Sequence, residues 1–200
     1  MTKAKDRKFN EILATALELF AHYGYKKTTL KDVADKLGMT KSNLYFYVSN
    51  KRDLYEKTVS MAFKGWQKAV RDAVEQAQDA GDKFSIMATQ SIQYLMEHDE
   101  LRSIFIRDPG IFTPFPNEDR FYKINLGAIR LIEEILTLGI KQGRFHEVDV
   151  KPTAELFFSI YVMFLIKTYV KSEGVSAIRM YEEGLKIILR GLCKDKPCKR

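Results

Sequence analysis

The sequence has few residues that could form disulfides or bind metal ions. Its only two cysteines, Cys193 and Cys198, lie in a lysine-rich tail with no other candidate ligand nearby. We interpret this tail as reduced and solvated, with a redox or metal role as the alternative. The three histidines, His22, His98 and His146, are isolated and form no pair at metal-ligand spacing. We therefore expect neither a metal site nor a cofactor.

Long apolar runs are missing as well. No stretch reaches about eighteen apolar residues without a charge, so no membrane-spanning helix is expected. The first eight residues are polar and no apolar run follows them, which argues against a secretory signal. Five prolines and eleven glycines among 200 residues leave room for long helices, and 46% hydrophobic with 30% charged residues is a globular composition. These features predict a protein of the cytoplasm.

Recognisable catalytic groups are also absent. The sequence offers no nucleophile paired with a base, no paired carboxylates in an apolar setting and no phosphate-binding glycine loop. Glu133 and Glu134 are adjacent, but neighbours on a helix point in different directions, and we expect both to face solvent. We therefore do not expect an enzyme.

Positive charge is concentrated at the N-terminus. Residues 1–52 contain eleven lysines and arginines against five aspartates and glutamates, a net charge of +6, whereas residues 53–200 carry only +1. Such asymmetry is typical of a nucleic-acid-binding domain joined to a different kind of domain. A basic terminus that only aids solubility would give the same charge. Charge alone therefore does not distinguish it from a nucleic-acid-binding domain, and the motif within this segment does.

Three helices are predicted within the basic segment. Apolar residues at helical spacing predict the first over about 8–23. Thr29 is a suitable N-cap for a second helix over about 30–37, and Gly38 allows the sharp turn that follows it. A third helix is predicted over about 41–47. Two short helices joined by a glycine-containing turn are typical of a helix-turn-helix, which fits the DNA major groove.

The third predicted helix has a polar outer side. Leu44 and Val48 are expected to point inward, because they lie four residues apart. The residues expected to face outward are all hydrogen-bond donors: Lys41, Ser42, Asn43, Tyr45 and Tyr47. Phe46 is expected to be mostly packed, and ordinary packing remains the alternative for the two tyrosines. Asn50 caps the next helix and puts Lys51 at its amino end, where a phosphate is favoured.

This order of elements resembles the tetracycline-repressor (TetR) family of bacterial regulators. The resemblance covers about residues 8–57 and rests on these matches: Leu19-Phe20, Gly24-Tyr25, Thr28-Thr29, Val33 to Gly38, Leu44-Tyr45 with Tyr47, and Asn50-Lys51 with Leu54. The remaining three quarters resemble the family in length and helical pattern only. Tyr47 stands where the family often has His, and Val48 where it often has Phe, so no particular operator sequence can be transferred.

The resemblance implies which residues contact DNA. It puts three residues at the family's base-facing positions, namely Lys41, Ser42 and Asn43. It puts others at phosphate-contacting positions or near the DNA backbone, namely Tyr45, Tyr47, Lys51 and Lys31. These roles suit the side chains, since asparagine pairs bidentately with adenine and lysine reaches guanine, each worth roughly 1–3 kcal/mol of discrimination. The predicted DNA-binding set is Thr29, Lys31, Thr40, Lys41, Ser42, Asn43, Tyr45, Tyr47 and Lys51.

The rest of the chain is predicted to be helical over about 51–78, 82–98, 100–106, 118–142, 152–166 and 176–192. The stretch 156–166 has one clearly polar residue in eleven, and a helix that is apolar all round must be covered all round. A second copy of the chain is the economical cover, and a core helix within one chain is the alternative. The resemblance implies the same homodimer, formed through residues 153–192.

We therefore predict an all-α fold of about nine helices. A three-helix helix-turn-helix DNA-binding domain occupies residues 1–52, a helical effector-binding and dimerisation domain occupies 53–192, and a basic, disordered tail occupies 193–200. The resemblance further implies an effector cavity in the second domain. Its candidate lining is apolar with scattered donors, which suits a lipophilic small molecule: Ser91, Tyr94, Phe105, Phe112, Asn125, Ser159, Tyr161 and Met163.

The predicted function follows from these expectations. The chain is expected to bind double-stranded DNA as a ligand-responsive transcriptional regulator, most simply a repressor. It would bind a palindromic operator as a homodimer and be released by a small-molecule effector. The alternatives are a sequence-tolerant architectural DNA-binding protein, or a regulator that activates or needs no effector.

Overall fold

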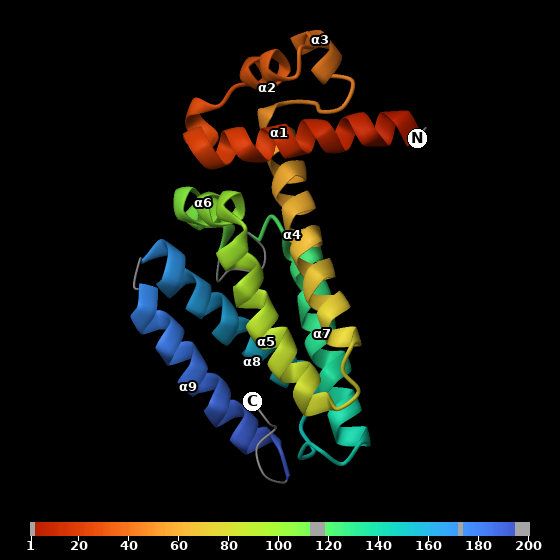
Figure 1. The fold of residues 1–200 in the computed structure, drawn as a ribbon, viewed down its shortest axis with the longest axis vertical. Coiled ribbons are helices and arrows are strands. Elements are labelled where there is room, and N and C mark those ends of the chain that lie inside the picture. Colours follow the sequence, from red (N-terminus) through yellow and green to blue (C-terminus); the bar gives the residue numbers. More distant parts are fainter. Residues whose placement is uncertain (1–2, 113–118, 172–173, 195–200) are drawn as a thin grey trace. The chain divides into compact units, whose positions relative to one another are not determined.

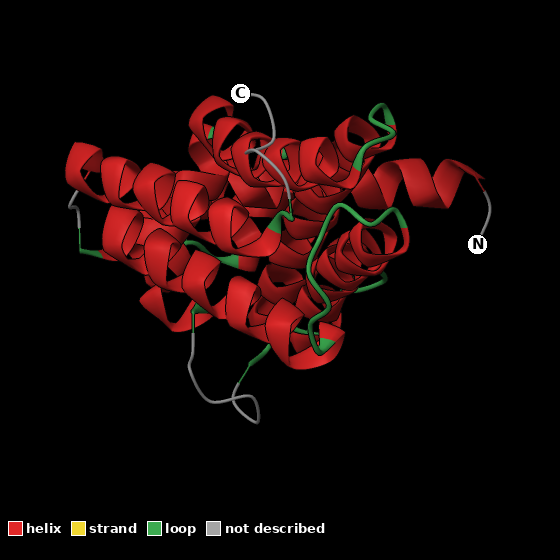
Figure 2. Ribbon diagram, turned by 90° about the horizontal axis from the view of Figure 1, so that it is seen from below, coloured by secondary structure: helices red, strands yellow, loops and turns green. Residues whose placement is uncertain are grey.

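The computed structural model describes residues 3–112, 119–171 and 174–194. Within these ranges every regular element is a helix (Figure 2). The only extended pairing among them is an isolated bridge between Phe145 and Cys193. The predicted all-α fold class is confirmed. The elements are α1 (Lys3–Lys27), α2 (Leu30–Lys36), α3 (Lys41–Leu44), α4 (Lys51–Glu75), α5 (Ala80–Glu97), α6 (Asp99–Arg107), the 3₁₀ turn η1 (Pro109–Ile111), α7 (Tyr122–Lys141), α8 (Val150–Leu165), the π-helical turn η3 (Ile166–Val170) and α9 (Gly174–Leu192). Cys193 is buried, so the prediction that it lies in a solvated tail is wrong, because the end of α9 packs against the loop after α7.

Some helix boundaries differ from those predicted. Helix α3 ends at Leu44, and residues 45–47 continue as turns. Helix α1 is longer than predicted but is interrupted at Gly24, whose φ of 81° is not helical. The predicted start of α5 near residue 82 is wrong, because the Asp79 carboxylate accepts hydrogen bonds from the backbone N–H groups of Gly81 and Asp82 and begins the helix earlier. The predicted start of α7 at 118 lies outside the described residues.

The chain divides into two compact units. The head unit comprises Met1–Gly65 and His98–Ile111, and the body unit comprises Trp66–Glu97 and Phe112–Arg200. The head unit is therefore larger than the predicted DNA-binding domain, since it includes the first half of α4 and all of α6. These are units of packing, so the division of function at residue 52 stays a prediction.

Helix α6 belongs to the head unit because it packs along α1 (Figure 1). Phe105 of α6 meets Phe63 of α4 edge to face, with 5.8 Å between the ring centres. The Tyr55 hydroxyl of α4 donates to the Asp108 carboxylate at 2.8 Å. These contacts fix α6 to α4, the helix that directly follows the helix-turn-helix.

The body core forms where α5, α7 and α8 pack together. Phe84, Leu136 and Ala154 are buried there, one from each helix. Gly139 of α7 allows the Phe145 ring to approach closely, because a Cβ at this position would lie 2.0 Å from the ring. The loop after α7 is thus held against the core by an aromatic side chain.

Helix α8 is apolar, yet much of it is uncovered within its own chain. The segment Val150–Val170 is long and apolar enough to span a membrane by length and composition, and only 17% of its most apolar window is buried. Leu156, Ile160 and Met163 share one side of α8 and are 55%, 40% and 52% exposed. The described residues of one chain do not supply a cover for this side.

Candidate nucleic-acid interface

Helix α2 begins with a capping box at Thr29. The Thr29 hydroxyl accepts a hydrogen bond from the Asp32 N–H at 3.2 Å, and the Asp32 carboxylate accepts one from the Thr29 N–H at 2.7 Å. After the helix, Gly38 adopts a φ of 60°, which favours glycine and allows the turn to α3. Lys31 is exposed on α2 and pairs with Asp35 at 2.6 Å. Hydrogen bonding to Asp35 raises the pKa of Lys31 and keeps it charged.

Helix α3 has the predicted orientation. The Thr40 hydroxyl accepts a hydrogen bond from the Asn43 N–H at 3.1 Å and caps the helix. Leu44 and Val48 are buried in the head core. The predicted DNA-facing residues exposed on the other side are Lys41, Ser42, Asn43 and Tyr45. This segment therefore offers one cation, one amide and two hydroxyls to solvent at the end of the helix-turn-helix.

Two predicted phosphate contacts are engaged within the head unit. Tyr47 is half-buried, and its ring stacks on Phe9 of α1 with 6.1 Å between centres. Lys51 donates to the Lys26 carbonyl at 3.1 Å, and its ammonium lies 4.6 Å from the centre of the Tyr25 ring. Tyr47 holds the turn after α3 to α1, and Lys51 holds the start of α4 to the end of α1. Their positions in the sequence did not indicate these structural roles.

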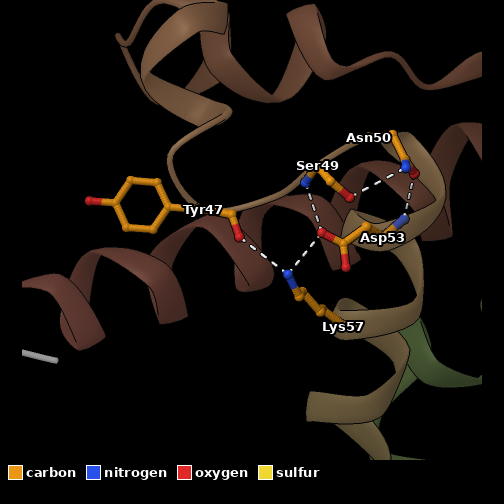
Figure 3. A network of polar contacts seen from close by, with 5 residues as sticks. All are labelled: Tyr47, Ser49, Asn50, Asp53 and Lys57. Atoms are coloured by element: carbon orange, nitrogen blue, oxygen red, sulfur yellow. Dashed lines mark hydrogen bonds and ion pairs between the residues drawn. The ribbon is translucent and has the colours of Figure 1, made fainter.

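The connection from α3 to α4 is held by a polar network (Figure 3). The Asn50 side chain accepts a hydrogen bond from the Asp53 N–H at 2.9 Å, and the Asp53 carboxylate accepts one from the Ser49 N–H at 2.8 Å. Lys57 donates to Asp53 at 2.8 Å and to the Tyr47 carbonyl at 3.3 Å. This confirms the predicted cap at Asn50 and fixes the end of α3 relative to α4.

Phe46 is the main departure from the predicted packing. It was expected to be mostly packed, but its side chain is 76% exposed. The reason is positional, because Leu44 and Val48 already fill the inner side and the Phe46 N–H bonds back to the Asn43 carbonyl at 3.3 Å. This turn directs Phe46 away from the head core.

Three of the predicted effector-binding residues gather in the body unit around Trp66. The Trp66 indole donates to the Ser91 carbonyl at 3.0 Å, and its ring centre lies 6.4 Å from Tyr94 and 6.1 Å from Tyr161. The Tyr161 hydroxyl is buried and forms no hydrogen bond of ordinary geometry among the described residues, although the Ser91 side chain lies close enough to lower its pKa slightly. Burial raises the pKa of Tyr161 well above its ordinary value, so this group stays neutral.

The other candidates lie elsewhere. Phe105 is in the core of the head unit, and Phe112 is half-buried just before the undescribed stretch 113–118. Asn125 donates to the Asp119 carboxylate at 2.9 Å. Ser159 and Met163 are exposed on α8. The eight residues therefore do not form a single lining.

Two aromatic residues of the Trp66 cluster were missed by the sequence analysis. The Tyr181 ring of α9 lies 6.0 Å from Tyr161 and 4.4 Å from Phe164. Phe164 follows Tyr161 by three residues, so helical spacing alone could have linked them. Nothing local could have brought Tyr181 to them, because that depends on how α9 packs.

Comparison with known proteins agrees with this geometry. The family model described as "Bacterial regulatory proteins, tetR family" matches residues 12–58, which contain the capped α2, the α3 segment and the network at α4. Residues 12–58 therefore form a helix-turn-helix of the tetR type. The proteins of this family are bacterial regulatory proteins, and the relatives and structural neighbours that this chain resembles are transcriptional regulators and not enzymes.

The similarity to known regulators extends beyond the helix-turn-helix. The negative transcriptional regulator IcaR of the biofilm operon icaADBC in Staphylococcus aureus is 26% identical over 176 residues, which cover 87% of this chain and 89% of IcaR. A TetR-family regulator of Pectobacterium atrosepticum has the same fold, with a TM-score of 0.77 at 20% identity and coverage of 99% and 100%. FadR of Bacillus subtilis, solved with stearoyl-CoA, has a TM-score of 0.75 at 17% identity and coverage of 92% and 98%.

Proposed function

We propose that this chain is a cytoplasmic repressor of the tetR family that binds a pseudo-palindromic operator as a homodimer and is released by a small lipophilic effector. The observation that carries the proposal is the outward side of α3, where donor groups are exposed on a short helix anchored by a buried Leu44 and a Thr40 cap. The α-helical shape suits the major groove, and the net charge of +6 over residues 1–52 favours phosphates.

Bases would be recognised by the amino half of this segment. Asn43 can accept from and donate to adenine, and Lys41 can donate to guanine, whereas Ser42 suits either. Phosphates would be contacted from the flanks by Thr29, Lys31, Thr40, Tyr45, Tyr47 and Lys51. An ammonium has three donors, and Lys51 uses one on the Lys26 carbonyl, so a phosphate contact would not require that bond to break.

Dimerisation would use the uncovered sides of α8 and α9. Leu156, Ile160 and Met163 supply the apolar side of α8. On α9, Met180 and Ile187 are exposed at helical spacing. Gly184 lies between them, and a Cβ there would meet nothing within 4 Å, so the helix has open space for close contact with another helix. Two copies joined in this way would bury these patches by two-fold symmetry and present two half-sites about one DNA turn, ~34–36 Å, apart.

The effector would bind at the Trp66 cluster. A buried hydroxyl without a partner is costly, and a ligand that hydrogen-bonds Tyr161 would remove that cost. The surrounding rings of Trp66, Tyr94 and Tyr181 suit an apolar molecule. FadR, which shares the fold, was solved with stearoyl-CoA, a molecule with a long apolar chain.

Release would follow from a shift between two conformations. One conformation binds the operator and the other does not. An effector that binds the second more tightly can lower operator affinity at most by the ratio of the effector's affinities for the two conformations. The repressor direction is favoured by the similarity to IcaR, a negative regulator.

The decisive test is selection of duplexes from random DNA with the full chain, followed by binding at one fixed salt concentration. The proposal expects a selected pseudo-palindrome that binds on the order of 1,000-fold more tightly than random DNA. A ratio near one would instead indicate the architectural alternative. Asn43→Ala should lower the affinity for the selected duplex by roughly 5- to 150-fold and relax the preference at one base pair, while Lys31→Ala should weaken binding to all sequences alike.

A further inference from the structure

The most exposed large apolar side chain of the described residues is Phe46, at 76%. It lies in the head unit directly after α3, within the segment proposed to enter the major groove. An exposed phenylalanine can neither bind a phosphate nor donate to a base, so the donor chemistry of the neighbouring residues does not explain it.

The position of Phe46 is fixed by the backbone on both sides. Its N–H bonds to the Asn43 carbonyl at 3.3 Å, and the next N–H, that of Tyr47, bonds to the Leu44 carbonyl at 3.0 Å. The Tyr47 ring stacks on Phe9, which anchors the turn to α1. Phe46 therefore projects from an ordered turn.

This turn aligns Phe46 with the residues proposed to contact bases. Phe46 follows Ser42 by four residues and Asn43 by three, and such residues are neighbours on one side of a helical turn. Leu44 and Val48, on the opposite side, are buried. The exposed side of the segment thus runs from Ser42 and Asn43 to an aromatic ring.

Only one group on the base edges of the major groove suits an apolar ring. Each base pair presents donors and acceptors there, and thymine alone adds a C5-methyl group. The surface around Phe46 carries Lys41 and Tyr45, which favour DNA over an apolar protein partner.

We infer that Phe46 is a specificity-determining residue that contacts the C5-methyl group of a thymine in each operator half-site. This thymine lies at the margin of the base pairs reached by Ser42 and Asn43, since Phe46 follows them at the carboxyl end of the segment. The inference rests on the proposed operator-binding function. It adds an apolar contact to a surface otherwise composed of donors.

The test uses the full chain and the duplex selected with it, in which each thymine is replaced in turn by deoxyuridine. This change removes one methyl group and leaves the hydrogen-bonding edge unchanged. At one position per half-site, replacing thymine by deoxyuridine should lower the affinity of the wild-type protein roughly four-fold, because the contact with about one buried methyl group is lost. Phe46→Ala should bind the thymine duplex more weakly and should be insensitive to deoxyuridine at that position. Phe46→Leu, which keeps an apolar side chain, should regain part of the sensitivity.

Tyr122→Ala is the matched control, because Tyr122 is an exposed aromatic residue of the body unit and should change neither affinity nor sensitivity. The inference is overturned if the selected half-site lacks thymine, if no deoxyuridine duplex binds more weakly, or if Phe46→Ala keeps the sensitivity. In each of those cases a selected operator would still support the proposed function. Failure to select any sequence would overturn the proposed function itself.

Discussion

Individual side chains of the head unit fall into two groups by what they contact. Leu44, Val48 and Tyr47 anchor the α3 segment to the core, whereas Lys41 and Asn43 have their functional groups in solvent. Sequence position alone did not separate them, because Tyr45 and Tyr47 have the same chemistry and only Tyr47 meets Phe9. The packing of α1 therefore decides that Tyr47 is half-buried while Tyr45 is exposed.

Tyr161 provides a prediction at this scale. Tyr161→Phe removes the unpartnered buried hydroxyl and keeps the ring contacts with Phe164 and Tyr181. An unsatisfied buried polar group costs roughly 1–3 kcal/mol, so the free energy of unfolding of the ligand-free protein should rise by about 1 kcal/mol in urea denaturation. Tyr94→Phe, at a less buried ring, should change it little. A loss of stability in Tyr161→Phe would show that the hydroxyl has a partner.

The same hydroxyl has a pH signature. Burial raises the pKa of Tyr161, so the folded protein keeps a proton that the unfolded chain releases above pH about 10. The protonated hydroxyl therefore makes its full contribution to the free energy of unfolding below that pH, and the contribution is lost as pH rises further. Tyr161→Phe should reduce this alkaline loss of stability, measured as the unfolding midpoint between about pH 9 and 11.

Among the helices, the junction of α3 with α4 depends on one carboxylate. Burial would raise the pKa of Asp53, but hydrogen bonds from Lys57 and the Ser49 N–H outweigh it, and the pKa is lowered. The ionised carboxylate therefore stabilises the folded state above pH about 3.9, which is its pKa in the unfolded chain. This stabilisation is lost as pH falls through the lower pKa of the folded state. The network in Figure 3 is thus a charged cap rather than a neutral one.

Replacing this cap gives a prediction for the element. Asp53→Ala should lower the free energy of unfolding by about 1 kcal/mol, because it removes a bond to the Ser49 N–H and the partner of Lys57. Thermal unfolding followed by circular dichroism measures this change. Asp72→Ala is the control on the same helix, since its pair with Lys68 is exposed and should contribute about 0.5 kcal/mol or less. Equal effects of the two changes would contradict the capping role.

At the level of the whole molecule, the uncovered side of α8 predicts the assembly. The wild-type chain of 23.2 kDa should behave as a dimer in light scattering after size-exclusion chromatography. Ile160→Glu places a charge in the centre of the proposed interface and should yield monomers with weaker operator binding. Met96→Glu is the control, because Met96 is also exposed, at 59%, but lies on α5, off the proposed interface. Vesicle binding by the wild-type chain, with no dimer in solution, would favour a membrane role for α8 instead.

Much of the fold could be predicted because its signals are local. Caps at Thr29, Thr40 and Asn50 and the turn at Gly38 act within four residues, and the structure has all of them. The predicted start of α5 near residue 82 was two residues late, because the Asp79 carboxylate caps a helix that begins at Ala80. The aromatic cluster was predicted only in part, since Tyr181 reaches Tyr161 through the packing of α9.

The helical class, the helix-turn-helix and the polar outer side of α3 follow from the amino-acid sequence, because periodicity, caps and turns depend on residues that are close together in the chain. The tertiary structure alone decided that Phe46 is exposed, that Lys51 bonds to the end of α1, and that the Tyr161 hydroxyl is buried without a partner. These properties depend on which distant helices pack against each residue, and such packing has no local signature.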